Sequence, residues 1–238
     1  MDAEGFLDLV KKRRNIRKFK PDPVPDEYVE IILEAARWSM SGANGQPCEY
    51  VVVKDSDTRA KIGEILTIQR QRAHIIEQTR LPELRHPGAS RDVKGAPGFK
   101  DAPVIIVVCG DLRSYQATVL TTHFYPSEGD TFHMNIGNAT QNIHLAAAAL
   151  GLGAQWVSTG LLAEEKLKRL LGIPEAFRIF VIVPVGYPAY KPPKSYRREL
   201  REMVHHDRYE PSKGRSSADV IEFIKDLRQR TLKSYSRY

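Results

Sequence analysis

Residues 135–160 read NIGNATQNIHLAAAALGLGAQWVSTG, and this stretch decides the fold. Apolar residues occupy nearly every face of a helix expected from about residue 131 to 150, and Gly151 follows it where a helix commonly ends. A helix that is apolar all round is buried, so this one is expected at the centre of the molecule. The short run 154–158 after it predicts a strand.

Helices and strands alternate on both sides of this stretch, without repeats or a linker. Further strands are expected at 49–54, 104–110 and 178–185, and helices at 6–10, 26–39, 163–171, 217–232 and from Ser56, as N-cap, to about residue 66 or beyond. The unbroken apolar run 104–110 indicates a strand buried on both faces. Four core strands between helices predict an α/β or α+β class.

Composition narrows the function classes. A chain of 238 residues fits one domain with excursions, and its net charge of +7 favours anionic partners. Its apolar runs fall short of the roughly 18 residues that span a bilayer, and acids near the N-terminus oppose a signal peptide. The two cysteines lack metal-ligand spacing. A cytoplasmic protein without membrane or metal partners is expected.

Several common catalytic motifs are absent from the sequence. It contains no GxGxxG after a strand, no GxxxxGK[ST], no HExxH and no GxSxG. Dinucleotide-binding Rossmann turns, P-loops, zinc proteases and serine hydrolases of the common kind each depend on one of these patterns. The histidines also show no zinc spacing. These classes therefore lack support.

Three separated segments carry the functional argument. The first is RRNIRKF at 13–19, followed by PVP at 23–25; the second is AARWSMSGANGQPCEYVVV at 35–53; the third is the opening stretch at 135–160. Alone, the first segment could be a solvated basic helix end, and the second could be an ordinary polar connection. Their order and spacing are what point to a function.

Together these segments resemble the FMN-dependent nitroreductase family. LGIP at 171–174, VGYP at 185–188 and RRELREMVHHDRY at 197–209 match its closing pattern, so the resemblance covers about residues 6–209. The sequence departs from the family pattern at Asn15, where Ser is usual, at Met40, where Pro is common, and at Cys48, where Trp is usual. No departure removes a group that must be charged, so flavin binding is expected to survive.

The resemblance implies an α+β fold of three layers (α/β/α), with a mixed, mainly antiparallel central sheet flanked by helices. It implies a homodimer with two sites at the subunit interface. One FMN-binding domain is expected over residues 1–209, with inserted lid segments at 68–100 and 112–130. Residues 210–238 are expected to form a helical extension that packs on the partner subunit.

The resemblance also assigns a flavin site. Arg13 and either Arg197 or Arg198 are expected to hold the FMN phosphate, because guanidinium groups match phosphate oxygens in fork geometry. The groups expected along the ribityl chain and the ring are Arg14, Asn15 and Arg17. A cation beside the ring would stabilise negative charge on the reduced flavin, and Arg17 is the candidate.

Two more segments complete that site by resemblance. The first is expected to reach the flavin of the neighbouring subunit through Ser41, Gly42, Asn44 and Gln46. The second is expected to place donors near the flavin N5 and O4 through Ser158, Thr159 and Gly160. No catalytic acid or base is expected, because the chemistry takes place at N5 of the cofactor.

The function implied is an FMN-dependent oxidoreductase. It would take a hydride from NADH or NADPH and reduce a small organic acceptor, such as a nitroaromatic or a quinone, by a ping-pong mechanism. An alternative is a member of the same fold with different flavin chemistry, either reductive dehalogenation or flavin fragmentation. Nucleic-acid binding through the basic segment 11–17, Arg70, Arg72 and the basic tail is disfavoured, because aromatic residues are not interleaved with these charges.

Overall fold

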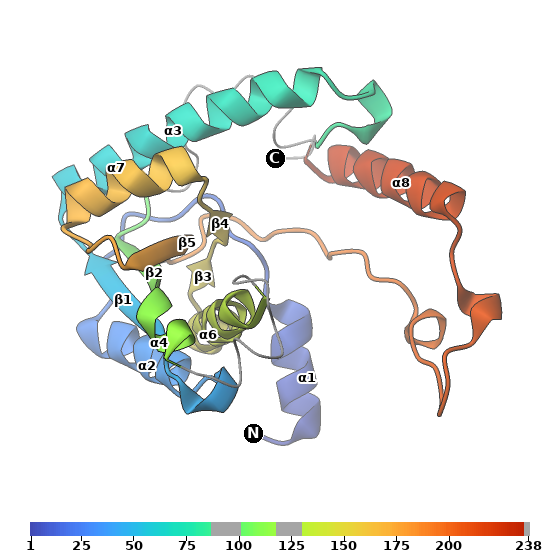
Figure 1. Cartoon of the computed structure of the whole chain (residues 1–238), viewed down its shortest axis with the longest axis horizontal. Helices are drawn as coiled ribbons and strands as arrows, with labels where there is room; N and C mark the ends of the chain where they lie inside the picture. The colour runs from blue at the N-terminus through green and yellow to red at the C-terminus, as the bar shows by residue number, and fades with distance from the viewer. Residues whose placement is uncertain (87–100, 118–129, 236–238) are drawn as a thin grey trace. The chain divides into compact units, whose positions relative to one another are not determined.

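The computed structural model describes residues 1–86, 101–117 and 130–235 (Figure 1). The chain divides into two compact units, which are described separately. The first unit consists of residues 1–69 and 95–191, and the second of residues 70–94 and 192–238. The first unit contains the β-sheet and most of the residues that the sequence places in the site.

The sheet of the first unit is built around two long neighbouring strands, β2 (Val104–Asp111) and β5 (Phe177–Gly186). Its order is β1-β2-β5-β3, where β1 is Cys48–Val53 and β3 is Gly153–Ala154, and the short β4 (Val157–Ser158) also pairs with β5. These ladders are antiparallel, and an isolated bridge between Asn15 and Ala154 is parallel. The mixed, mainly antiparallel sheet expected from the resemblance is confirmed.

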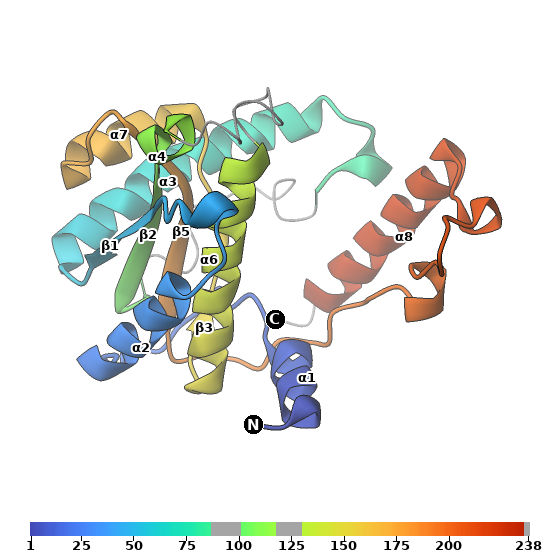
Figure 2. The ribbon, with the colours of Figure 1, turned by 60° about the horizontal axis from the view of Figure 1, so that its bottom comes forward.

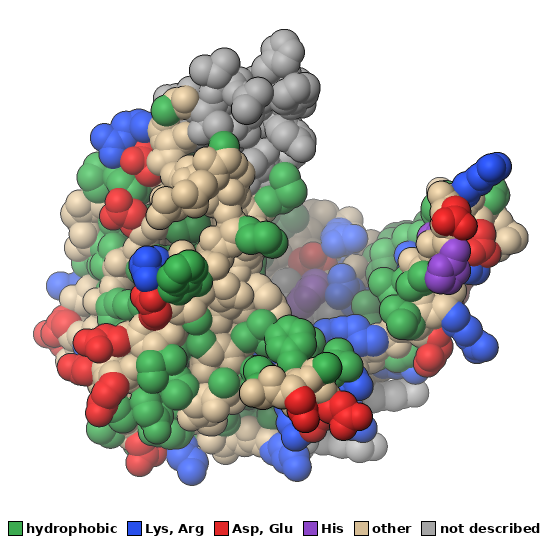
Figure 3. Space-filling model, turned by 90° about the horizontal axis from the view of Figure 1, so that it is seen from below, with side chains coloured by type: hydrophobic (Ala, Val, Ile, Leu, Met, Phe, Trp, Pro, Cys, Tyr) green, Lys and Arg blue, Asp and Glu red, His purple; other side chains and the backbone are tan. Residues whose placement is uncertain are grey.

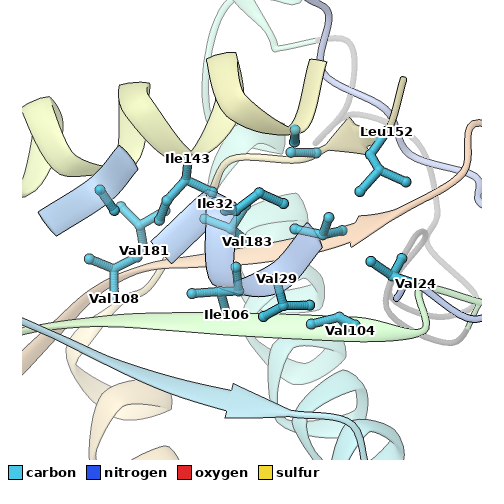
Figure 4. Close-up of a cluster of buried hydrophobic side chains, with 14 of the residues drawn as sticks. Val24, Val29, Ile32, Val104, Ile106, Val108, Ile143, Leu152, Val181 and Val183 are labelled. Carbon is cyan, nitrogen blue, oxygen red and sulfur yellow. The ribbon is translucent and has the colours of Figure 1, made fainter. Parts of the chain in front are cut away.

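Helices cover both faces of this sheet (Figure 2). On one face, α2 (Asp26–Arg37) and α6 (Asp130–Ala149) pack with alternate residues of β2 that include Val104, Ile106 and Val108 (Figure 4). On the other face, the intervening residues of β2 pack with α7 (Leu161–Leu171) and with the first half of α3 (Ser56–Gln78). Because both faces of β2 are apolar, the strand requires a helical layer on each side. The three-layer α+β class is confirmed.

A bulge in β5 shapes the end of β4. The register between β2 and β5 shifts at Val108 and Cys109, which leaves Phe180 without a partner on β2. Thr159 uses the carbonyls there: its N–H donates to Phe180 O at 3.1 Å, and its hydroxyl donates to Ile179 O. Because of the bulge, Thr159, the residue after β4, is hydrogen-bonded to β5 through both its backbone and its side chain.

The N-terminal helix α1 (Ala3–Lys12) begins with a side-chain cap, because the Asp2 carboxylate accepts from the Gly5 N–H at 2.8 Å. Apolar side chains remain exposed on this helix and on the neighbouring α2–α6 face (Figure 3). They are Phe6, Leu7, Val10, Ile31, Trp38, Met40 and Met134.

Several element boundaries differ from the sequence-based expectation. Helix α3 continues to Gln78, and Asp55 rather than Ser56 caps it, accepting from the Thr58 N–H at 2.8 Å. The strand expected at 154–158 is split into β3 and β4. A short helix, α4 (Leu112–Gln116), lies in the segment expected to be irregular, and the parts of the lid calls at 87–100 and 118–129 lie outside the described residues.

The second unit contains α8 (Ser217–Tyr235), which contacts the short helix η2 (Pro82–Leu84). The Tyr196 ring contacts two residues of α8: its centroid is 6.3 Å from the ring centroid of Phe223 and 4.7 Å from the guanidinium carbon of Arg230. Residues 192–209 therefore group with the C-terminal helix rather than with the sheet. The domain boundary expected at residue 209, and the packing of the extension on a partner, remain predictions.

No helix among the described residues has the length and apolarity needed to cross a membrane.

The tight contact of Gly153 with Ile16 gives a test of the fold. A Cβ at Gly153 would lie 2.5 Å from Ile16 Cγ1, so Gly153→Ala is expected to lower the free energy of unfolding by about 1–3 kcal/mol in urea denaturation. The matched control is Gly137→Ala in α6, where a Cβ meets no atom within 4 Å. It is expected to be neutral or stabilising, because alanine favours a helix. Equal effects of the two changes would contradict this packing.

Candidate functional site

The basic segment 13–19 crosses the edge of the sheet in extended form. The Ile16 N–H donates to Ala154 O at 3.0 Å, and the Lys20 N–H donates to Tyr187 O at 2.8 Å. Ile16 and Phe19 are buried, and Arg13, Asn15 and Arg17 are half-buried. Backbone pairing with the sheet thus fixes where these polar side chains stand.

Trp156 joins this segment to the end of β4. Its backbone N–H donates to Asn15 Oδ1 at 3.0 Å, and its indole Nε1–H donates to Ser158 Oγ at 3.1 Å. Because Asn15 accepts through its oxygen, its amide NH₂ remains a donor, and Ser158 can still donate its hydroxyl hydrogen. Two residues far apart in the sequence, Asn15 and Ser158, are therefore bonded to one residue, Trp156, and each keeps a donor. Sequence reasoning missed Trp156.

The side chain of Arg14 caps the C-terminal end of α1. Its guanidinium donates to the carbonyls of Lys11 and, at 2.8 Å, Arg13, at the C-terminal end of α1. Helix ends leave carbonyls without intrahelical donors, and a cationic side chain there is favourable. Contact of Arg14 with a ribityl chain stays a prediction.

The side chain of Gln69, in α3, forms two hydrogen bonds with the backbone of the segment 158–160. Its Oε1 accepts from the Gly160 N–H at 2.6 Å, and its Nε2 donates to Ser158 O at 2.9 Å. Thr159 uses its N–H and hydroxyl on β5. Of the donors expected near a flavin ring, those of Thr159 and Gly160 are thus engaged within the protein. The Ser158 hydroxyl is the group best placed to donate outward.

The loop expected to reach a neighbouring flavin is strained. Ala43, Asn44 and Gln46 have φ angles of 51°, 54° and 45°, a conformation that L-residues rarely adopt. Ser41 Oγ accepts from the Gln46 N–H at 3.0 Å and closes the loop. Gly42, Asn44 and Gln46 are exposed, so the loop faces outward.

Arg197 and Arg198 lie in the second unit and differ in their surroundings. Arg198 is half-buried, and its side chain binds Glu202, with its terminal nitrogen donating to Glu202 O at 2.9 Å. Arg197 is exposed and donates to Tyr196 O at 2.8 Å. The side chain of Arg198 is therefore paired with the carboxylate of Glu202. Because Arg197 donates to a neutral carbonyl, it is the better candidate of the two for binding an anion.

Two buried polar side chains near Arg13 and Trp156 lack hydrogen-bond partners among the described residues. They are His144, through both ring nitrogens, and Gln155, through Oε1. The His144 ring stacks on Trp156 with centroids 6.3 Å apart. Burial, together with the positive charge of Arg13, lowers the pKa of His144 to about 4. Buried polar atoms without partners are rare, and here they fit a site that receives a polar ligand.

Metal binding and thiol chemistry find no support in the described part of the chain. No three His, Cys, Asp or Glu side chains gather there as metal ligands would. Burial raises the pKa of Cys48 to about 11 and that of Cys109 to about 12, so both thiols stay protonated at neutral pH.

Comparison with known proteins decides the family. The Nitroreductase family matches residues 10–187. This chain belongs to that family. The resemblance inferred from the sequence is confirmed, and with it the assignment to the oxidoreductases.

Individual relatives differ in the reactions they are named for. A protein of Methanothermobacter thermautotrophicus named "Putative NADH dehydrogenase/NAD(P)H nitroreductase" is 32% identical over 188 residues, covering 78% of each chain. Iodotyrosine deiodinase 1 of Rattus norvegicus is 29% identical over 197 residues, covering 79% of this chain and 64% of the rat protein. A solved structure of oxidised iodotyrosine deiodinase bound to FMN and 3-iodo-L-tyrosine superposes with a TM-score of 0.68 at 24% identity, covering 86% of this chain and all of that one.

The buried His144 predicts a pH dependence of stability. Its pKa is about 4 in the folded chain against 6.5 as the ordinary value, so the unfolded state binds more protons between these values. The free energy of unfolding should therefore fall by about 3 kcal/mol as the pH drops from 7 to 4 through this group. In His144→Leu, this fall in the free energy of unfolding should be absent. The measurement is the free energy of unfolding of variant and wild type, from urea denaturation, at each pH. A difference independent of pH would contradict the burial of a neutral imidazole.

Proposed function

We propose that this chain binds FMN and uses it to transfer electrons from NADH or NADPH to a small organic acceptor, such as a nitroaromatic or a quinone. The observation that carries the proposal is the pair of hydrogen bonds from Trp156 to Asn15 and Ser158. They join the arginine-rich segment to the end of β4, the two parts of the chain that the family pattern assigns to one flavin.

The residues present suit the parts of FMN. Arg13, half-buried at the end of α1, supplies a cation for a phosphate dianion. Arg197 stays a phosphate-binding candidate from the family pattern alone. Asn15 and Arg17 offer donors for the ribityl hydroxyls and the ring, and Ser158 offers its hydroxyl. The unpartnered polar atoms of His144 and Gln155 support a polar occupant beside them.

When bound, FMN would supply hydride acceptance from the nicotinamide and electron transfer to the acceptor. The side chains bind and orient, and none is needed as a general acid or base. Arg17 supplies positive charge that favours a negatively charged flavin ring. Gln69 fixes the peptide planes of residues 158–160 and so holds Ser158 in position.

A homodimer accounts for the exposed apolar side chains on α1, α2 and α6 (Figure 3). In this arrangement the loop 41–46 reaches the flavin of the neighbouring subunit, as the family pattern implies. Light scattering on the holo-protein at micromolar concentration tests it: a dimeric mass supports the arrangement, and a monomeric mass contradicts it.

The visible spectrum of the purified protein tests the function directly. Bound FMN should give the two absorption bands of an oxidised flavin, which NADH or NADPH should bleach without oxygen and a nitroaromatic or quinone should restore. A protein that shows no flavin and fails to bind added FMN would overturn the proposal.

Reductive dehalogenation is the second candidate function, favoured by the similarity to rat iodotyrosine deiodinase 1. In that reaction two electrons and a proton convert an aryl halide to the arene and a halide ion. Halide release from an iodinated phenol under the same anaerobic conditions distinguishes it. Release faster than nitro or quinone reduction would favour this candidate.

Arg13→Ala should weaken FMN binding more than it weakens folding. The arginine supplies charge-assisted hydrogen bonds to the phosphate worth roughly 1.5–3 kcal/mol, so the dissociation constant should rise about tenfold to a hundredfold. Titration of apo-protein with FMN, followed by flavin fluorescence, measures it. The matched control is Lys12→Ala, since Lys12 is exposed and pairs with Asp8 at 3.0 Å. Equal affinities of Arg13→Ala and wild type would remove Arg13 from the phosphate site.

A further inference from the structure

One face of α6 carries three asparagines that the proposed function does not use. Asn135, Asn138 and Asn142 are spaced by three and four residues, so they lie along one side of the helix. Each bonds to the backbone of residues 35–42, about 100 positions earlier in the chain. We call them the asparagine face.

The asparagine face holds the chain from the end of α2 to the start of the loop. Asn142 Nδ2 donates to Ala35 O at 2.9 Å, and Asn138 Nδ2 donates to Met40 O at 3.2 Å. Asn135 Oδ1 accepts from the Gly42 N–H at 3.0 Å. Ala35 lies in the last turn of α2, where carbonyls lack intrahelical donors, so Asn142 satisfies a group that the helix itself cannot. The three bonds fix the path by which the chain leaves α2.

The segment that follows is strained. Ala43, Asn44 and Gln46 are in the left-handed region, although the adjacent Gly45 has an ordinary φ of −69°. Non-glycine residues there persist only when the surrounding structure holds them, and such strain gathers at ligand-binding sites. Among the described residues, the Gln46 N–H donates to Ser41 Oγ within the loop, and the Gly42 N–H donates to Asn135 of the asparagine face at the start of the loop.

We propose that Asn135, Asn138 and Asn142 are positioning residues that hold the loop 41–46 in the conformation that contacts the flavin. This inference rests on the proposed function. Without these bonds the loop relaxes towards unstrained backbone, and the flavin must restrain it again on binding. The loss therefore appears as weaker FMN affinity rather than as unfolding.

Asn138 offers the cleanest test, because its side chain is exposed and alanine is a better helix former. Asn138→Ala should leave the melting temperature of the apo-protein near that of wild type while raising the dissociation constant for FMN about threefold to tenfold, the loss of one neutral hydrogen bond. The matched control is Gln141→Ala, one turn along the same helix and also exposed, which should leave both quantities unchanged.

A second change separates positioning from packing. Ala43→Gly removes the steric cost of the left-handed conformation at φ 51° and should restore most of the affinity lost in Asn138→Ala. A role in packing alone would not be rescued by a change in the loop. An affinity of Asn138→Ala within a factor of two of wild type, or a loss that Ala43→Gly does not rescue, would overturn the inference.

The two proposals fail in distinguishable ways. If wild-type apo-protein does not bind FMN, the proposed function fails. If wild type binds FMN and Arg13→Ala weakens it, but Asn138→Ala does not, the flavin site stands and the asparagine face has no part in it. A fall in apo-protein melting temperature with unchanged FMN affinity would assign the asparagine face to stability alone.

Discussion

The first unit depends on the burial of β2 on both faces and its pairing with β5. Val104 to Val108 are at most 1% exposed, and alternate residues point into two separate clusters. A strand without a solvent face is stable only between two apolar layers, so α2 with α6 and α3 with α7 must pack where they do. The edges of this sheet then set where the basic segment and the end of β4 can dock.

The sequence predicted most of this frame because the frame is made of apolar patterns. The strands at 104–110 and 178–185 and the central helix were found within about two residues. The end of α3, expected at about residue 66 or beyond, was left open. Residues 70–78 bury no apolar side chain, so the sequence shows no helical periodicity there. The break between β3 and β4 was also missed. The pairing with β5 keeps one register through it, and the Gln155 N–H still donates to Pro184 O at 3.1 Å. Pro184 has no N–H to return that bond, and the Trp156 N–H donates to Asn15 instead, so the ladder is interrupted.

The candidate site was predicted through family motifs, and these name residues without saying which of their groups face outward. Thr159 and Gly160 match the pattern, but their donors bind β5 and Gln69. Gln69 lies 91 residues from Gly160, and Asn142 lies 107 residues from Ala35. Bonds between a side chain and a backbone so distant leave no local signature, so only the folded structure reveals them.

The central helix shows how one element serves both stability and the site. Ile136 and Ile143 fill the core against the sheet, the asparagine face binds α2 and the loop after it, and His144 stacks on Trp156. The sequence suggested an all-round apolar helix, yet its polar side chains contact the chain at residues 35–42, through the asparagines, and Trp156, through His144. Because the isoleucines fix the helix against β2, its polar side chains are held without rearrangement when a ligand arrives, which is the condition for a preorganised site. The start of the loop 41–46 and the Trp156 ring are therefore held, through α6, by the same apolar packing that makes the sheet.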